Sequence, residues 1–208
     1  RLDTRFATAS AGKVFVASAI LRLIEDGALK LENTIGDLLP IDWQKIDRGI
    51  TVRSLLNHTS GIPDYFDESV QTEYADLWKD YPNYKIRRNA DILPLFIDKP
   101  MMYVSGEKFQ YNNTGYVVLA LILEAITCVP FDAYLKKTIS DPYGYGVWLR
   151  KAGEETYIPY IQGCDPGVSF VSSYDRVSRS SITIVSNYGC NVWAIRRTFS
   201  RKFDGTFH

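Results

Sequence analysis

The feature that most constrains the fold is a nearly continuous apolar stretch from Tyr116 to Cys128, YVVLALILEAITC, in which Glu124 is the one charged residue. A helix that is apolar on almost every side is stable only when other elements surround it. The stretch is also too short to cross a bilayer as a helix, so we expect no transmembrane segment in this chain. It therefore predicts a helix at the centre of a globular core.

Length, charge and cysteine content limit the class of protein. A chain of 208 residues with 46% hydrophobic composition can bury a sizeable core, and we expect one domain over residues 1–208. Lys and Arg (24) balance Asp and Glu (24), which argues against nucleic acid or an anionic membrane as a partner. The three cysteines show no C-x-x-C spacing, and this argues against a disulfide framework and against a metal site.

The first part of the chain, residues 10–140, reads as mainly helical. Apolar residues recur at spacings of three and four from Lys13 to Asp26, which is typical of a helix with a broad buried face. The stretch ITVRSLLN (50–57) predicts a short helix capped by Thr51, followed by a loop, HTSGIPDY. A further short helix is expected at DILPLFID (91–98).

The second part, residues 141–208, has the pattern of strands followed by a helix. Short β-branched or aromatic runs alternate with turns and predict three or four consecutive antiparallel strands: YGYGVWLRK, TYIPYIQG, VSFVSSY and SSITIVS. The tail NVWAIRRTFSRKF places Val192, Ile195, Phe199 and Phe203 on one helical face, which should pack on that sheet. The fold class is therefore α+β, an antiparallel sheet flanked by helices plus a mainly helical lobe.

Ser10 and Lys13 form the first candidate catalytic pair. A serine hydroxyl is a weak nucleophile unless a base lies within hydrogen-bonding reach, and a lysine three residues later on the same helical turn can supply that base. Ser105 and Lys108 have the same spacing, but Gly106 and turn residues follow Ser105, so Ser10 is the better candidate. The alternative is that Ser10 is an ordinary helix cap and Lys13 a solvated first-turn residue.

A second candidate element is YNNTGY (111–116), at the start of the apolar helix. The phenol of Tyr111 can transfer protons, and the amide of Asn113 can bind a substrate carbonyl. An ordinary helix cap is the alternative for this element too.

These stretches, with LLNHTSGIPDY (55–65) and YGYGVWL (143–149) in the same order, resemble the serine β-lactamase and penicillin-binding protein superfamily. The class C-like branch is the most similar; it contains DD-peptidases, esterases, D-amino-acid-specific peptidases and catalytically silent members. The resemblance implies a β-lactamase/transpeptidase-like fold, an extracytoplasmic location, no cofactor, and a peptide, β-lactam or ester substrate.

Residue by residue, the resemblance makes Ser10 the acylated nucleophile, Lys13 its proton partner and Tyr111 the general base and acid. Asn113 would hold the substrate amide. The activity implied is that of a serine hydrolase working through an acyl-enzyme.

The family's third motif, a Lys or His followed by any residue and Gly, has Ile161-Gln162-Gly163 as its counterpart. Gln162, Gly163 and Cys164 would line the substrate site, and the backbone N–H groups of Ser10 and Cys164 would stabilise the oxyanion. Isoleucine cannot pair with a substrate carboxylate. A catalytically silent member that binds a ligand or partner is therefore the alternative function.

The family also carries two strands before the Ser-x-x-K helix and a long mixed segment before the YGYG strand. We therefore expect that segments before Arg1 and between Ser140 and Asp141 are missing from this chain. His58 could orient a catalytic group, but it lies in a family loop and is interpreted as a structural hydrogen-bonding residue. A thiol hydrolase using Cys164 and His58 is a weaker alternative, because loop cysteines are usually inert.

Overall fold

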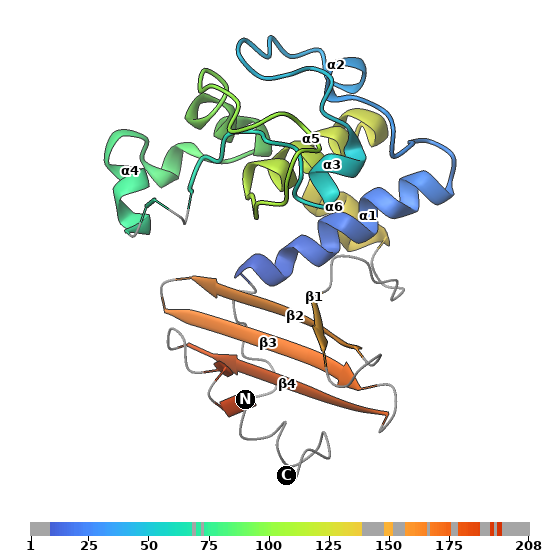
Figure 1. The fold of residues 1–208 in the computed structure, drawn as a ribbon, viewed down its shortest axis with the longest axis vertical. Coiled ribbons are helices and arrows are strands. Elements are labelled where there is room, and N and C mark those ends of the chain that lie inside the picture. The colour runs from blue at the N-terminus through green and yellow to red at the C-terminus, as the bar shows by residue number, and fades with distance from the viewer. Residues whose placement is uncertain are drawn as a thin grey trace. The chain divides into compact units, whose positions relative to one another are not determined.

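The structure is a computed structural model that describes residues 9–67, 70–71, 73–138, 148–151, 157–165, 167–175, 179–187, 192–193 and 195–196. The chain forms two compact units (Figure 1). One unit combines Arg1–Phe15 with Gly144–His208 and contains the sheet, and the other, Val16–Tyr143, is helical. The segment that carries Ser10 therefore belongs to the sheet unit and not to the helical one. That both units make one domain stays a prediction.

The sheet has the predicted meander topology. Its four strands follow chain order and every neighbouring pair is antiparallel: β1 (Trp148–Lys151), β2 (Tyr157–Asp165), β3 (Val168–Asp175) and β4 (Ser180–Ser186). The β-branched and aromatic residues of these runs suit a pleated, half-buried surface. Val171 of β3 is fully buried. Residues 143–147 of the first predicted strand lie outside the described residues.

The described residues of the tail, 192–193 and 195–196, are helical and contact β2. Val192 of the predicted apolar face is buried, but Ile195 is 42% exposed, so the prediction is wrong at this residue. The Trp193 indole donates a hydrogen bond of 2.8 Å to Gln162. The Arg196 guanidinium lies 4.9 Å from the centre of the Tyr160 ring. Phe199 and Phe203, the rest of the predicted apolar face, lie outside the described residues.

The helical unit is built around the predicted central helix, α5 (Thr114–Thr127). Val118, Leu119, Ile122 and Leu123 are each fully buried, as a helix apolar on nearly all sides requires. It contacts three further helices and one 3-10 helix: α2 (Ile35–Leu38), α3 (Val52–Leu56), α6 (Phe131–Thr138) and η4 (Asn89–Leu95). None of the helices among the described residues has the length and apolar character that a membrane crossing needs.

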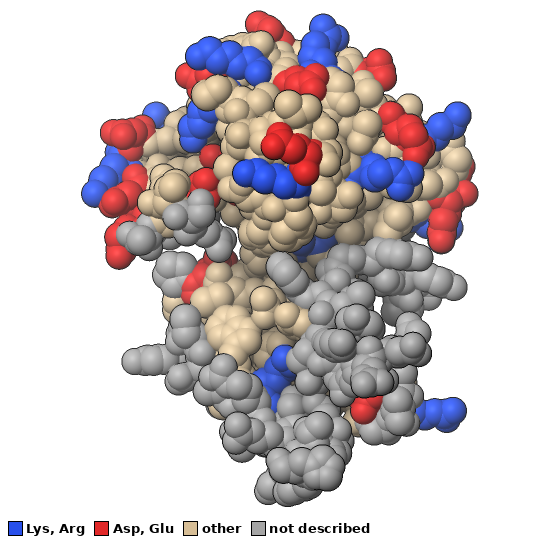
Figure 2. Space-filling model, viewed as in Figure 1, with Lys and Arg blue, Asp and Glu red and all other residues tan. Residues whose placement is uncertain are grey.

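The remaining helical elements are short except α1 (Lys13–Glu25), which has a buried face of Val16, Ala17, Ala19, Ile20 and Leu23. Phe15, one of the apolar residues expected on that face, is 40% exposed. The others are η1 (Ala9–Gly12), η2 (Tyr74–Asp76), α4 (Leu77–Asp80) and η3 (Asn83–Lys85). On the face shown in Figure 2, acidic and basic side chains of the helical unit are interspersed, which agrees with the balanced composition.

Two helix predictions can be compared in detail. The Thr51 cap of α3 is confirmed, because the Thr51 hydroxyl accepts from the Ser54 N–H and the Ser54 hydroxyl accepts from the Thr51 N–H. At 91–98 the structure has a 3-10 helix, η4, shifted towards the N-terminus. Pro94 lies inside it and has no N–H to donate, which disfavours a regular α-helix at this point.

Candidate active site

Ser10 and Lys13 lie together where η1 passes into α1. The Lys13 Nζ atom donates to the Ser10 Oγ atom over 3.2 Å, and both side chains are half-buried. A lysine that merely solvates the first turn would be exposed and would direct its ammonium group to water. The arrangement instead gives the hydroxyl a nitrogen within proton-transfer distance, which a serine nucleophile needs.

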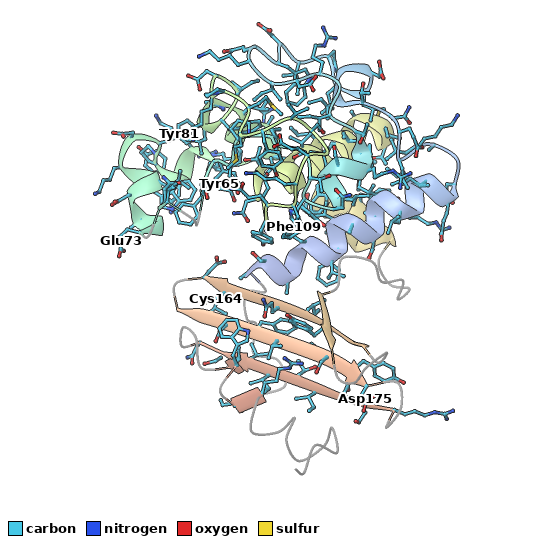
Figure 3. The ribbon with its side chains drawn as sticks, viewed as in Figure 1. Tyr65, Glu73, Tyr81, Phe109, Cys164 and Asp175 are labelled. Carbon is cyan, nitrogen blue, oxygen red and sulfur yellow. The ribbon has the colours of Figure 1, made fainter. Side chains whose placement is uncertain are left out.

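The turn that carries Ser10 packs on β2 and β3 within the sheet unit. The counterpart of the third motif lies on β2, with Gly163 opposite Phe170 and Cys164 opposite Ser169. Cys164 is exposed near the end of β2 (Figure 3). Ser10, Lys13, Gln162, Gly163 and Cys164 are therefore all members of one unit.

Alternation along β2 separates the side chains of this motif. Successive strand residues point to opposite faces of a sheet, so Tyr160 and Gln162 share one face and Ile161 and Gly163 the other. The Gln162 carbonyl oxygen accepts the Trp193 hydrogen bond, so this side chain is anchored to the tail helix. A ligand that binds at this part of β2 would therefore contact the backbone and the face that carries Ile161.

Tyr111 and Asn113 lie in the helical unit, directly before α5. The residue that caps α5 with its side chain is Asn112, which lies between them. Its buried side chain accepts from the Gly115 N–H at 2.7 Å and donates to the Ile62 carbonyl at 2.8 Å. The Asn113 side-chain nitrogen points to Asp64 Oδ2 at 3.4 Å. The same nitrogen donates to the Phe66 carbonyl at 3.3 Å. The substrate-binding role of Asn113 stays a prediction.

Asp64 is a buried residue of this region that sequence reasoning missed. Its carboxylate accepts from the Asn113 N–H at 2.7 Å and from the N–H and the hydroxyl of Thr114 at 3.1 Å each. Burial raises the pKa of Asp64 above its ordinary value, although the hydrogen bonds from Asn113, Thr114 and Phe66 act to lower it. An acceptor at this place fixes the first turn of α5, where N–H groups have no partner within the helix.

His58 has the structural hydrogen bond that the sequence interpretation assigned to it. Its Nδ1 atom accepts from the Asn112 N–H at 3.1 Å, and its carbonyl accepts from the Gln110 N–H at 2.9 Å. Cys164, its partner in the alternative thiol hydrolase, belongs to the other unit. Among the described residues, no group of three His, Cys, Asp or Glu side chains could hold a metal ion.

The second Ser-x-x-Lys stretch, Ser105–Lys108, lies in a turn as expected. Gly106 has φ +90°, which excludes a helix at this point. The Lys108 ammonium lies 4.8 Å from the centre of the Tyr103 ring, where it makes a cation–π contact. This stretch therefore lacks the helical turn that brings Lys13 to Ser10.

Sequence comparison identifies relatives of the chain. Residues 1–160 match the family model described as Beta-lactamase. Penicillin-binding protein 4* of Bacillus subtilis (strain 168) is 31% identical over 169 residues, which are 78% of this chain and 35% of that protein. Protein flp of Staphylococcus aureus (strain NCTC 8325 / PS 47) is 25% identical over 197 residues, 91% of this chain and 34% of that protein. The chain thus spans about a third of the length of these curated relatives.

Solved structures show the same fold. A penicillin-binding protein from Bacillus halodurans superposes with a TM-score of 0.87 at 26% identity, covering 96% of this chain and 87% of that one. A D-stereospecific amidohydrolase from Streptomyces sp. has a TM-score of 0.80 at 17% identity, covering 98% and 88%, which shows the fold alone. The chain therefore has the β-lactamase/transpeptidase fold, and it belongs to the beta-lactamase family, a family of serine hydrolases.

Proposed function

We propose that this protein is a serine hydrolase that works through an acyl-enzyme, with Ser10 as its nucleophile. The observation that carries the proposal is the hydrogen bond of 3.2 Å between Lys13 Nζ and Ser10 Oγ, on a turn packed against β2. In the first step Ser10 Oγ bonds to the substrate carbonyl carbon while its proton passes to the base. The bond to the leaving group breaks, and the leaving nitrogen or oxygen takes up a proton.

The other roles follow from the family resemblance. Lys13 and Tyr111 move the proton, Asn113 positions the substrate amide, and the backbone N–H groups of Ser10 and Cys164 stabilise the oxyanion. In the second step water attacks the ester of Ser10 and releases the acid. Gln162 and Gly163 form the part of β2 along which the substrate lies.

The proposed substrates are amides or esters of the penicillin-binding type: D-amino-acid peptides, β-lactams or simple esters. The relatives named as penicillin-binding proteins support this class. The apolar Ile161 side chain gives a substrate carboxylate no partner, so within this class we expect penicillins to acylate Ser10 more slowly than esters that carry no carboxylate.

The test is the intact mass of the protein before and after incubation with a penicillin, with peptide mapping of any adduct. We expect one adduct on Ser10, and none in Ser10→Ala. The Ser105→Ala variant is the matched control, since it removes the other serine of a Ser-x-x-Lys stretch and should still be acylated. No adduct on the wild type, together with no hydrolysis of p-nitrophenyl acetate, would contradict the proposal.

The second candidate function is reversible ligand binding by a catalytically silent member of the family, and Ile161 is the feature that favours it. A silent member would bind a penicillin or a D-amino-acid peptide in equilibrium dialysis without any change in mass. Covalent modification of Ser10 excludes it.

A further inference from the structure

We propose that His58 is the positioning residue for Tyr111. The inference rests on the proposed function, in which Tyr111 is the general base. It states that the His58 side chain, which lies in a different loop, holds Tyr111 in position. His58 lies 53 positions before Tyr111 and directly after α3, and both belong to the helical unit. Contacts of several kinds connect them.

The backbone on both sides of Tyr111 is tied to His58. The residue before it, Gln110, donates its N–H to the His58 carbonyl at 2.9 Å. The residue after it, Asn112, donates its N–H to His58 Nδ1 at 3.1 Å. Two hydrogen bonds to one residue, flanking the tyrosine, restrict both the position and the rotation of its backbone.

The side chain of Tyr111 is held by the same residue. The Tyr111 and His58 ring centroids are 4.8 Å apart with an interplanar angle of 35°. The Tyr116 ring stacks on His58 at 5.0 Å and 27°. Tyr116 is buried, and its hydroxyl donates to the Leu56 carbonyl at 3.0 Å, so the stack is anchored to the end of α3.

The hydrogen bond from Asn112 specifies the tautomer of the neutral His58 ring, and the end of α3 specifies the His58 backbone. Because Nδ1 accepts an N–H, the neutral ring carries its proton on Nε2. The residue has φ +60°, in the left-handed region that a bulky side chain seldom adopts. The end of α3 holds it in this conformation, because the His58 N–H donates to the Leu55 carbonyl at 3.4 Å and the Thr59 N–H donates to the Ser54 carbonyl at 2.8 Å.

Placement matters for a general base because proton transfer needs the phenol at a defined distance from the reacting group. A misplacement of about 1 Å can slow a reaction on the order of a hundredfold. A defect in positioning a base lowers the rate of the chemical step and leaves initial binding of the ligand largely intact.

The experiment uses two variants that divide the contacts of His58. His58→Phe keeps a ring for the stack and removes the acceptor for Asn112. His58→Asn keeps an acceptor near the place of Nδ1, tolerates the left-handed backbone, and removes the ring. Phe109→Leu is the matched control: the Phe109 and His58 ring centroids lie 5.9 Å apart in an edge-on arrangement, and Phe109 is 60% exposed.

The readouts are the acylation rate constant with a fluorescent penicillin and the dissociation constant of the initial complex, measured separately. We expect His58→Phe to lower the acylation rate constant about tenfold or more with little change in the dissociation constant. We expect His58→Asn to recover part of this loss, and Phe109→Leu to react at the wild-type rate. Thermal unfolding of each variant shows that it is folded under the assay conditions.

Two outcomes separate failure of this inference from failure of the proposed function. If the wild type is acylated on Ser10 and both folded His58 variants react as fast, positioning by His58 is wrong while the proposed function stands. If the wild type reacts with no penicillin or ester, the proposed function fails. Positioning is then decided by NMR of ring-labelled tyrosine, with Tyr111→Phe used for assignment. Equal flip rates of the Tyr111 ring in the wild type and in both His58 variants would overturn the inference, and faster flipping in the variants supports it.

A direct measurement of the histidine itself is also accessible, since the chain has two histidines, His58 and His208. Long-range nitrogen–proton NMR spectra distinguish the two neutral tautomers. The His58 signal is the one that is present in the wild type and absent from His58→Asn. We expect this signal to have the pattern of a neutral ring protonated on Nε2. A ring protonated on Nδ1 would contradict the hydrogen bond from Asn112.

Discussion

Tyr116 shows at the scale of one residue how burial and a single hydrogen bond change an acid. Its side chain is 7% exposed, and its hydroxyl donates to the Leu56 carbonyl. Burial raises the pKa of Tyr116 from 10.0 to about 12, because the phenolate would be desolvated. The phenolate would also lose the proton that it donates to Leu56.

This shift predicts a specific loss of stability at alkaline pH. Between pH 10.0 and about 12 the unfolded chain has released the Tyr116 proton while the folded chain still binds it, so stability falls as the pH rises. Two pKa units correspond to about 3 kcal/mol. We expect the free energy of urea unfolding to fall less steeply over this range in Tyr116→Phe than in the wild type. The difference between the two proteins at neutral pH reports the lost hydrogen bond alone, and equal slopes would contradict the prediction.

Which site residues the sequence predicts depends on how far apart the partners lie in the chain. Ser10 and Lys13 are three positions apart, so helical periodicity alone brings them together. Asp64 and Asn113 are 49 positions apart. Nothing in the sequence GIPDY indicates that the Asp64 carboxylate accepts from backbone N–H groups of a distant segment. The role of Asp64 could therefore not be predicted before the fold was known.

At the scale of elements, the loop after α3 is the support on which the segment before α5 is built. The Gly61 carbonyl accepts from the Met102 N–H and the Thr59 carbonyl from the Gly106 N–H, each at 2.8 Å. Gly61 has φ +68°, and a Cβ atom added there would lie 2.1 Å from the Tyr103 carbonyl oxygen. The two segments can approach this closely because residue 61 has no side chain.

Gly61→Ala should therefore be strongly destabilising. We expect a loss of about 3 kcal/mol or more in the free energy of unfolding, because a backbone oxygen cannot move aside as a flexible side chain can. Gly27→Ala is the matched control, since Gly27 has φ +73° but nothing within 4 Å of the added atom. It should lose about 1 kcal/mol from backbone strain. Equal losses in the two variants would show that the close approach to Tyr103 is unimportant.

Elements with a strong period were predictable, and those without one were not. The helices α1 and α5 and the succession of strands β2, β3 and β4 were predicted from the sequence, and the structure confirms them. Residues 67–92 showed no period, and the described residues there form the short elements η2, α4 and η3, which are too brief to leave a repeating pattern. At η4 the pattern indicated a helix, but Pro94 changed its type.

At the scale of the whole molecule, the charge balance has a measurable consequence. The formal net charge at pH 7 is zero and the isoelectric point is near 6.9, so neighbouring molecules repel one another least at neutral pH. We expect the solubility of this chain to pass through a minimum there and to rise at about two pH units on either side. The polyethylene glycol concentration at half precipitation measures this. A curve that changes in one direction across the range would contradict the prediction.

The fold class was predictable from motifs in their order, whereas the grouping of the Ser10 segment with the sheet was not. The sequence changes texture after Pro142, and this favoured a helical first part that includes Ser10. The structure instead groups Arg1–Phe15 with the strands. A contact between the turn at Ser10 and strand β2 joins segments far apart in the chain, and composition carries no trace of such a pairing.

The stacked rings of Tyr111, His58 and Tyr116 also give the protein an optical property. Aromatic rings held in one asymmetric arrangement produce near-ultraviolet circular dichroism, which disappears when specific packing is lost even if the helices survive. Part of that signal will come from a loop and a helix start meeting around one histidine. The near-ultraviolet circular dichroism signal can therefore be used to follow the folding of this region in real time, with no substrate present.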